Sequence, residues 1–168
     1  VMLSGETAMG IDPANVVSVM AKIAEQAESD AMGMNTYSNI KYEVDSNDTT
    51  NAICDAACTT ARDLRAKAII AVTTSGYTAR LVSKFRPNQD IVAATPEIKT
   101  FHQLSMSWGV LPVLALDQSD TDKLFRHAID CAKQIDAVGV GDTVVITGGV
   151  PLRTNGTTNT LKVETISK

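Results

Sequence analysis

The chain has 168 residues, 44% of them hydrophobic, and a formal net charge of −4. This length and apolar content suffice for one main domain with its own core. The basic residues are scattered, which argues against a nucleic-acid partner, and no apolar stretch approaches the ~20 residues that span a membrane. No signal-peptide pattern is present, so we expect a cytoplasmic protein whose partners are small molecules or protein chains.

The N-terminal part of the sequence predicts a strand end and one long helix. Residues 1–3 have the composition of the end of a buried strand, and a chain that begins there without an initiator methionine is expected to be a fragment. Asp12 is a helix N-cap, Pro13 suits the first helical position, and apolar residues recur at helical spacing as far as Ala27. Residues 33–48 are rich in Asn, Ser and Asp, which predicts a connector and a domain boundary there or just before it.

The rest of the chain predicts an α/β domain. A second long helix begins at Thr49. The predicted strands are 68–72, 91–94, 110–116, 143–146 and 161–166, and helices near 77–85, 97–106 and 120–136 separate the first four. This alternation predicts a parallel sheet with helices on both faces, because right-handed crossovers place them there. The last connection, 147–160, has no helical pattern, and its brevity predicts an antiparallel strand at the sheet edge.

The most informative segment is the end of the strand at 68–72. Its apolar run stops abruptly in a hydroxylated turn that opens a helix, namely Thr73, Thr74, Ser75, Gly76, Tyr77 and Thr78. If the fourth strand lies on the other side of the first, the winding of the sheet reverses between them, and open α/β sheets bind ligands at such a point. The other loop leaving this point, 147–158, is also dominated by Gly, Ser and Thr.

Two interpretations of these loops remain open on the residues alone. Backbone amides and hydroxyls can hold phosphate oxygens, with Arg153 supplying positive charge at the rim. Alternatively, the hydroxyls only cap a helix and the glycines only make turns. Capping is so common that spacing alone favours it by roughly two to one.

The cysteines are predicted to be structural. Cys54 and Cys58 share one helix face, yet no further cysteine or histidine completes a tetrahedral metal set nearby. We therefore expect no metal site, and small buried hydrophobic thiols are favoured by about five to one.

Four motifs carry a family resemblance. In chain order they are VMLSGETAMGIDP, IIAVTTSGYTARLVSKFRP, SWGVLPVL and GDTVVITGGVPLRTNGTTNTLKV. With them the chain resembles the C-terminal third of pyruvate kinase, the bacterial enzymes most closely. The resemblance implies that residues 1–31 are the last strand and helix of a catalytic (β/α)8 barrel and that 32–168 form the C-terminal regulatory domain. It also implies a three-layer α/β/α fold with a five-stranded sheet in the order 3-2-1-4-5, the fifth strand antiparallel.

The family transfers the phosphoryl group of phosphoenolpyruvate to ADP, making pyruvate and ATP with Mg2+ and usually K+. The residues responsible belong to earlier barrel strands, so the resemblance implies an inactive fragment that itself holds no cofactor. Ser4-Gly5-Glu6-Thr7 matches the family's barrel mouth, where Ser4 and Glu6 either lie near substrate or only brace neighbouring loops.

With the resemblance added, phosphate binding becomes the favoured interpretation of the hydroxylated turn, ahead of helix capping. In members activated by sugar phosphates, the loop matching Thr73–Thr78 holds a phosphate and the loop matching 151–158 closes over it, which implies an effector site. Its predicted residues are Thr73, Thr74, Ser75, Gly76, Tyr77, Thr78, Arg153, Gly156 and Thr157.

The chain departs from the family at the helix that starts near Asp120. Members that respond to fructose 1,6-bisphosphate carry a Trp and an Arg there, and neither is evident. Asp117, Asp120 and Asp122 would repel a second phosphate unless Lys123 or Arg126 turns inward. A sugar monophosphate such as ribose 5-phosphate, or a nucleoside monophosphate such as AMP, is therefore the expected effector.

The last strand, 161–166, is predicted to be an edge with alternating apolar residues, and open edges tend to find partners. The resemblance implies that it pairs with its own copy across a two-fold axis within a homotetramer. Two alternatives remain. One is a purely structural assembly module with no metabolite site. The other is an independent flavodoxin-like binding domain, in which residues 1–31 would be integral to the fold.

Overall fold

The computed structural model describes residues 2–33, 48–116, 118, 120–152 and 158–167. The chain divides into two compact units, Val1–Ile40 and Lys41–Lys168. Within the described ranges, no helix has both the length and the apolar character needed to cross a lipid bilayer.

The N-terminal unit contains a short helix and a long one. Helix α1 covers Gly5–Ala8 and helix α2 covers Pro13–Gly33. Asp12 caps α2 as predicted, since its Oδ1 accepts a hydrogen bond from the backbone N–H of Asn15 at 3.1 Å. Pro13 occupies the first helical position.

The predicted strand at residues 1–3 was wrong for the two residues that the structure describes. Met2 and Leu3 have no strand conformation, and the Met2 side chain is 82% exposed. A strand exists only where a neighbour accepts and donates its ladder hydrogen bonds, and the described residues of this unit include no other strand.

The second unit is built on a five-stranded sheet in the order β3-β2-β1-β4-β5. Its strands are β1 (Ala68–Val72), β2 (Asp90–Thr95), β3 (Val110–Leu114), β4 (Thr143–Gly148) and β5 (Thr160–Thr165). The pairs among β1 to β4 are parallel, and β5 runs antiparallel to β4 with Val163 opposite Val145. The predicted order is confirmed. Because β2 and β4 flank β1, the winding of the chain reverses between β1 and β4.

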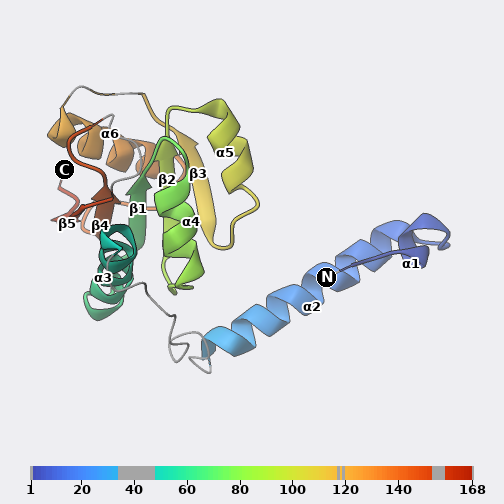
Figure 1. The fold of residues 1–168 in the computed structure, drawn as a ribbon. Coiled ribbons are helices and arrows are strands. Elements are labelled where there is room, and N and C mark those ends of the chain that lie inside the picture. Colours follow the sequence, from blue (N-terminus) through green and yellow to red (C-terminus); the bar gives the residue numbers. More distant parts are fainter. Residues whose placement is uncertain (1, 34–47, 117, 119, 153–157, 168) are drawn as a thin grey trace. The chain divides into compact units, whose positions relative to one another are not determined.

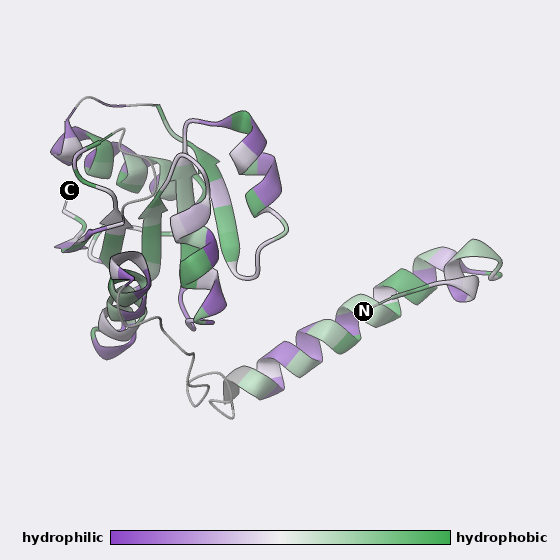
Figure 2. Ribbon diagram, viewed as in Figure 1, coloured by the Kyte–Doolittle hydropathy of each residue, from purple (hydrophilic) through white to green (hydrophobic). Residues whose placement is uncertain are grey.

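Helices cover both faces of this sheet (Figure 1). On one face lies α6 (Thr121–Gln134); on the other lie α3 (Thr49–Asp63), α4 (Tyr77–Lys84) and α5 (Ile98–Leu104). Successive strand residues point to opposite faces, so Ile70 packs with α6 whereas Ile69 packs with α3 and α4. Figure 2 shows β1 to β4 as largely hydrophobic and the helices as striped, which is the pattern of strands buried on both faces. The predicted three-layer fold is confirmed.

Cys54 and Cys58 belong to the core between α3 and the sheet, which confirms their predicted burial. Their side chains are 0% and 9% exposed, and their sulfurs lie 4.0 and 3.9 Å from the carbonyl oxygens of Thr78 and Val82 on α4. Burial raises the pKa of both thiols to about 12, because the interior disfavours the thiolate. Both side chains therefore stay protonated near neutral pH.

We expect iodoacetamide at about pH 8 to leave Cys54 and Cys58 unmodified in the folded chain and to alkylate them after denaturation, as measured by mass spectrometry. Rapid alkylation of either residue under native conditions would contradict their burial.

The raised pKa values also predict a pH dependence of stability. The two buried, protonated thiols contribute fully to the free energy of unfolding below about pH 9, where the thiols of the unfolded chain are protonated too. This contribution is lost as the pH rises towards 12.

Candidate functional site

The turn after β1 is shaped by its own side chains. The Thr73 N–H donates to the Ala94 carbonyl at 3.0 Å, and the Thr73 hydroxyl oxygen accepts from the Gly76 N–H at 2.9 Å. The Thr74 carbonyl accepts from the Thr100 hydroxyl of α5 at 2.9 Å, while the Thr74 side chain itself is exposed. The turn is therefore tied to β2 and α5 by hydrogen bonds.

Gly76 is required by this turn for two reasons. Its φ of 78° lies in the left-handed region that side chains disfavour. A Cβ built on Gly76 would also lie 3.1 Å from both Leu104 Cδ2 and Thr100 Cγ2. The glycine thus allows the backbone to approach α5 closely just before α4 begins.

The first turn of α4 has backbone donors for which the described residues provide no acceptor. The N-cap residue, Gly76, has no side chain to cap it, and the Ser75 hydroxyl accepts from the Tyr77 N–H only at a long 3.4 Å. The N–H groups of Thr78 and Ala79 donate to no acceptor in the described part of the chain. Such groups at a helix start suit an anion. Side-chain capping, the alternative interpretation of this turn, is represented among the described residues by the Thr73 bond to the Gly76 N–H and the long Ser75 contact to the Tyr77 N–H. The Tyr77 side chain is 43% exposed.

Thr158, at the end of the second hydroxylated loop, contacts the start of α4. The hydroxyl oxygens of Thr78 and Thr158 lie 2.6 Å apart, and the two residues are only 5% and 3% exposed. The Thr158 N–H lies 3.4 Å from the hydroxyl oxygen of Thr50, which is also buried, at the start of α3. Three segments far apart in the sequence therefore converge at the carboxyl ends of β1 and β4.

The base of the second loop is closed by one asparagine. Asn159 accepts from the Val150 N–H at 2.9 Å and donates to the Val150 carbonyl at 2.5 Å. These bonds hold together the two ends of the loop, 150 and 159, beside the sheet. The predicted site residues Arg153, Gly156 and Thr157 lie outside the described residues.

Arg80 is a feature of the site that sequence reasoning missed. Its Nη1 lies 2.8 Å from the position that a Cβ on Gly76 would occupy, so the guanidinium lies against the turn. With the described residues, this exposed side chain makes no hydrogen bond or ion pair. Its position could have been predicted from the sequence, because Arg80 follows Gly76 by four residues and that spacing places a helical side chain over the preceding turn.

The carboxylates at the start of α6 already have partners. Asp120 caps the helix by accepting from the Lys123 N–H at 3.0 Å, and Asp122 lies 3.9 Å from the Lys162 ammonium of β5. Lys123 and Arg126 are exposed on α6, and Asp117 lies outside the described residues. Sequence reasoning identified these acids without identifying their structural roles.

Ser4 and Glu6, in the other unit, bond to one another. The Ser4 N–H and hydroxyl both approach Glu6 Oε2, at 3.1 and 3.4 Å. Hydrogen bonds from the backbone N–H groups of Glu6 and Ser4 lower the pKa of this carboxyl group. Across the described residues, no three His, Cys, Asp or Glu side chains are grouped closely enough to hold a metal ion.

The second unit is a doubly wound α/β domain with a hydroxyl-lined turn at its switch point, the place where open α/β sheets commonly bind ligands. Comparison with known proteins is more specific, because residues 51–164 match the family model of the pyruvate kinase alpha/beta domain. The chain therefore belongs to the pyruvate kinase family and contains its C-terminal α/β domain.

Full-length relatives agree with this match. The chain is 42% identical to a pyruvate kinase of Clostridium acetobutylicum over 99% of its own length and 35% of the relative. It is 43% identical to one of Lactobacillus delbrueckii subsp. bulgaricus and 41% identical to one of Staphylococcus aureus, over 98% and 99% of this chain and 28% of each relative. The chain thus spans about a third or less of the length of these relatives.

Proposed function

We propose that this chain is the C-terminal allosteric and oligomerisation domain of a cytoplasmic pyruvate kinase, the glycolytic enzyme that makes pyruvate and ATP from phosphoenolpyruvate and ADP. The family match and the relatives, all pyruvate kinases, support this proposal. In it, residues 1–31 are the end of the catalytic barrel, in which Met2 and Leu3 join a strand only when the neighbouring barrel strands are present. Mg2+ and K+ are held by parts of the enzyme outside this chain. The chain alone is then catalytically inactive.

Within this function, the Thr73–Thr78 turn binds the phosphate of an effector. The observation that carries the proposal is the 2.6 Å contact between the buried hydroxyls of Thr78 and Thr158, which brings the second loop to the turn. Beside it lie the N–H groups of Thr78 and Ala79, which have no described acceptor, and the guanidinium of Arg80. Amides, hydroxyls and one cation together form a chemically suitable phosphate site.

A monophosphate fits the site at the carboxyl ends of the strands better than a bisphosphate does. Helix α6 begins at the carboxyl ends of the same strands, with the Asp120 carboxylate at its N-cap and Asp122 in its first turn. A second phosphate brought to this helix start would meet two negative charges. Ribose 5-phosphate and AMP are therefore the proposed effectors.

Assembly in this proposal uses β5. Its one strand partner in the described structure is β4, so its other edge is open, and Val163 is 41% exposed. Two copies paired through this edge would give a two-fold contact within a homotetramer. Effector binding then biases subunit orientation, with a coupling that is typically ~1–3 kcal/mol.

The test of the effector site is the affinity of Arg80→Met for AMP and ribose 5-phosphate, measured by titration calorimetry. Loss of one exposed cation from the site should weaken binding about fivefold. Lys84→Met, which removes a cation from the far end of the same helix, should bind like the unchanged chain. Equal affinity in all three proteins would exclude Arg80 from the site. Absence of binding by the unchanged chain would instead favour the purely structural assembly module.

A further inference from the structure

The sheet has two outer strands, β3 on one side and β5 on the other (Figure 1). Within the described structure each of them pairs with one neighbour, β3 with β2 and β5 with β4. A sheet that is open at both edges can add a strand on either side, and repeated addition through unlike edges gives an open-ended chain of copies. The backbone groups that the two edges present therefore decide how copies of this domain can assemble.

The register of β3 on β2 fixes which backbone groups of β3 point outward. At the end of the strand, the Ala115 N–H donates to the Thr95 carbonyl at 2.9 Å. Alternate residues of a parallel strand bond to the same neighbour, so the odd-numbered residues of β3 direct their N–H and C=O groups towards β2. The even-numbered residues, Val110, Pro112 and Leu114, direct theirs away from the sheet.

This outward side of β3 offers few hydrogen-bond donors to an incoming strand. The Val110 N–H already donates to the Ser107 carbonyl at 3.3 Å. Pro112, the middle residue, has no N–H, and its ring fills the place where an incoming carbonyl group would bond. The Leu114 N–H is the one outward donor of β3 that no described residue accepts. A continuous ladder of hydrogen bonds therefore cannot form along this edge.

The outward side of β5 is different. The Ile166 N–H donates to the Asp142 carbonyl at 2.9 Å, which places the even-numbered residues of β5 against β4. The N–H groups of Leu161, Val163 and Thr165 point outward, and no described residue accepts them. This edge can form a complete ladder with an added strand.

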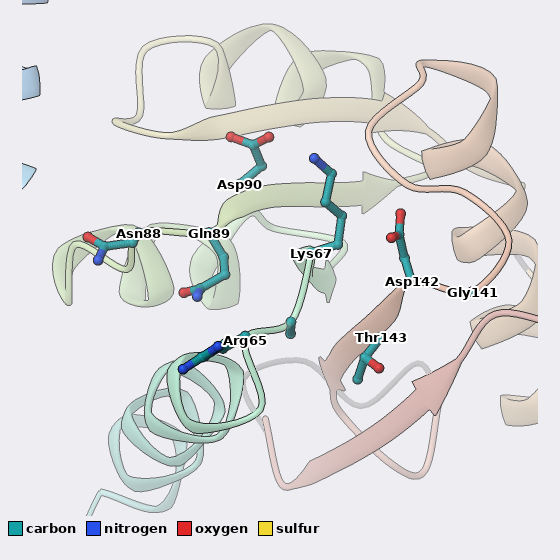
Figure 3. Close-up of a pocket in the computed structure, with 9 residues that line it drawn as sticks. Arg65, Lys67, Asn88, Gln89, Asp90, Gly141, Asp142 and Thr143 are labelled. Carbon is teal, nitrogen blue, oxygen red and sulfur yellow. The ribbon is translucent and has the colours of Figure 1, made fainter.

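Charged side chains do not protect the β3 edge. Figure 3 shows Lys67, Asp90 and Asp142 at or just before the first residues of β1, β2 and β4, where they line a cavity. Strand β3 itself contains no charged residue, and its Leu114 is 51% exposed. Charges and prolines are common means by which edge strands avoid pairing with other chains. On β3 only Pro112 can serve this purpose.

We propose that Pro112 closes the β3 edge to strand addition by a second copy of this chain. With this proline in place, copies cannot join through β3, and an open-ended chain of copies linked edge to edge does not form. The inference concerns β3 alone. It depends neither on the proposed effector site nor on whether copies pair through β5.

The test restores the missing donor in the 168-residue chain. Pro112→Val supplies an N–H and a side chain that favours strands, and Pro112→Ala supplies the same N–H with a smaller side chain. Sedimentation velocity measures the mass of each protein from micromolar to millimolar concentrations, and urea unfolding checks that each is folded. We expect the mass of both variants to rise with concentration to about twice that of the unchanged chain or more, because each β3 edge can then take another copy.

A second proline provides the matched control. Because the Leu114 N–H also points outward, Leu114→Pro removes a donor from the edge without removing a hydrogen bond to β2. Pro112→Val combined with Leu114→Pro should therefore return to the mass of the unchanged chain. The proposal would be overturned if the Pro112→Val and Pro112→Ala variants had the mass of the unchanged chain at every concentration. It would also be overturned if the added proline left the association of Pro112→Val intact.

Discussion

Replacing Thr78 with valine should lower the free energy of unfolding by about 1–3 kcal/mol, because the buried Thr158 hydroxyl then loses its partner. Thr158→Val should cost a similar amount for the same reason, since the two oxygens lie 2.6 Å apart and both residues are nearly fully buried. In the double variant no hydroxyl of the pair is left unsatisfied. Its loss of stability should therefore be clearly smaller than the sum of the single losses.

Urea unfolding of the four proteins measures this coupling. The chain offers a matched control, because the hydroxyls of Thr143 and Thr165 form a comparable pair at 3.3 Å in an exposed position. Water replaces a lost partner there, so the same cycle on Thr143 and Thr165 should give a coupling near zero. Additive losses at Thr78 and Thr158 would mean that the second loop is not held to the turn by this contact.

Gly76→Ala should destabilise the chain by about 2–4 kcal/mol. About 1–2 kcal/mol comes from placing a side chain in the left-handed region, and the remainder from overpacking against α5. The collision is with Leu104 and Thr100, which lie 3.1 Å from the new Cβ, whereas the Arg80 guanidinium is the flexible end of an exposed side chain that can move away. The proposed phosphate binding at the turn should be lost with this change.

Gly109→Ala is the control that separates strain from collision. Gly109 has a φ of 66°, yet a Cβ there would meet nothing within 4 Å. Its substitution should therefore cost only the backbone strain, about 1–2 kcal/mol. Both variants are compared by urea unfolding under the same conditions. Equal losses at the two glycines would show that the close approach of the turn to α5 contributes nothing.

The sheet could be predicted from sequence because its signals are local. An apolar run as in Ile69–Val72, bounded by polar or small residues, identifies a buried strand without knowledge of its neighbours. The prediction of a strand at residues 1–3 was wrong because it used only this local rule. Its apolar residues satisfy the rule, but a strand also needs a neighbouring strand for its backbone hydrogen bonds, and Met2 is instead 82% exposed.

The site was only partly predictable. The Thr73–Thr78 turn was visible because hydroxylated residues and a glycine directly follow a strand. Thr50 could not be assigned to it, because its approach to Thr158 spans 108 residues and depends on how α3 packs on the sheet. Asp120 was taken as a repulsive charge in the site, although its position before a helix also predicts the capping contact to Lys123 that the structure contains.

The most direct test of the proposed phosphate site is an NMR titration of the 168-residue chain with AMP and with ribose 5-phosphate. We predict saturable shifts of the Ser75, Tyr77, Thr78 and Ala79 amides, whose N–H groups surround the start of α4, together with a shift at Thr158. Resonances of these residues that stay unmoved at millimolar concentrations of both ligands would contradict the account.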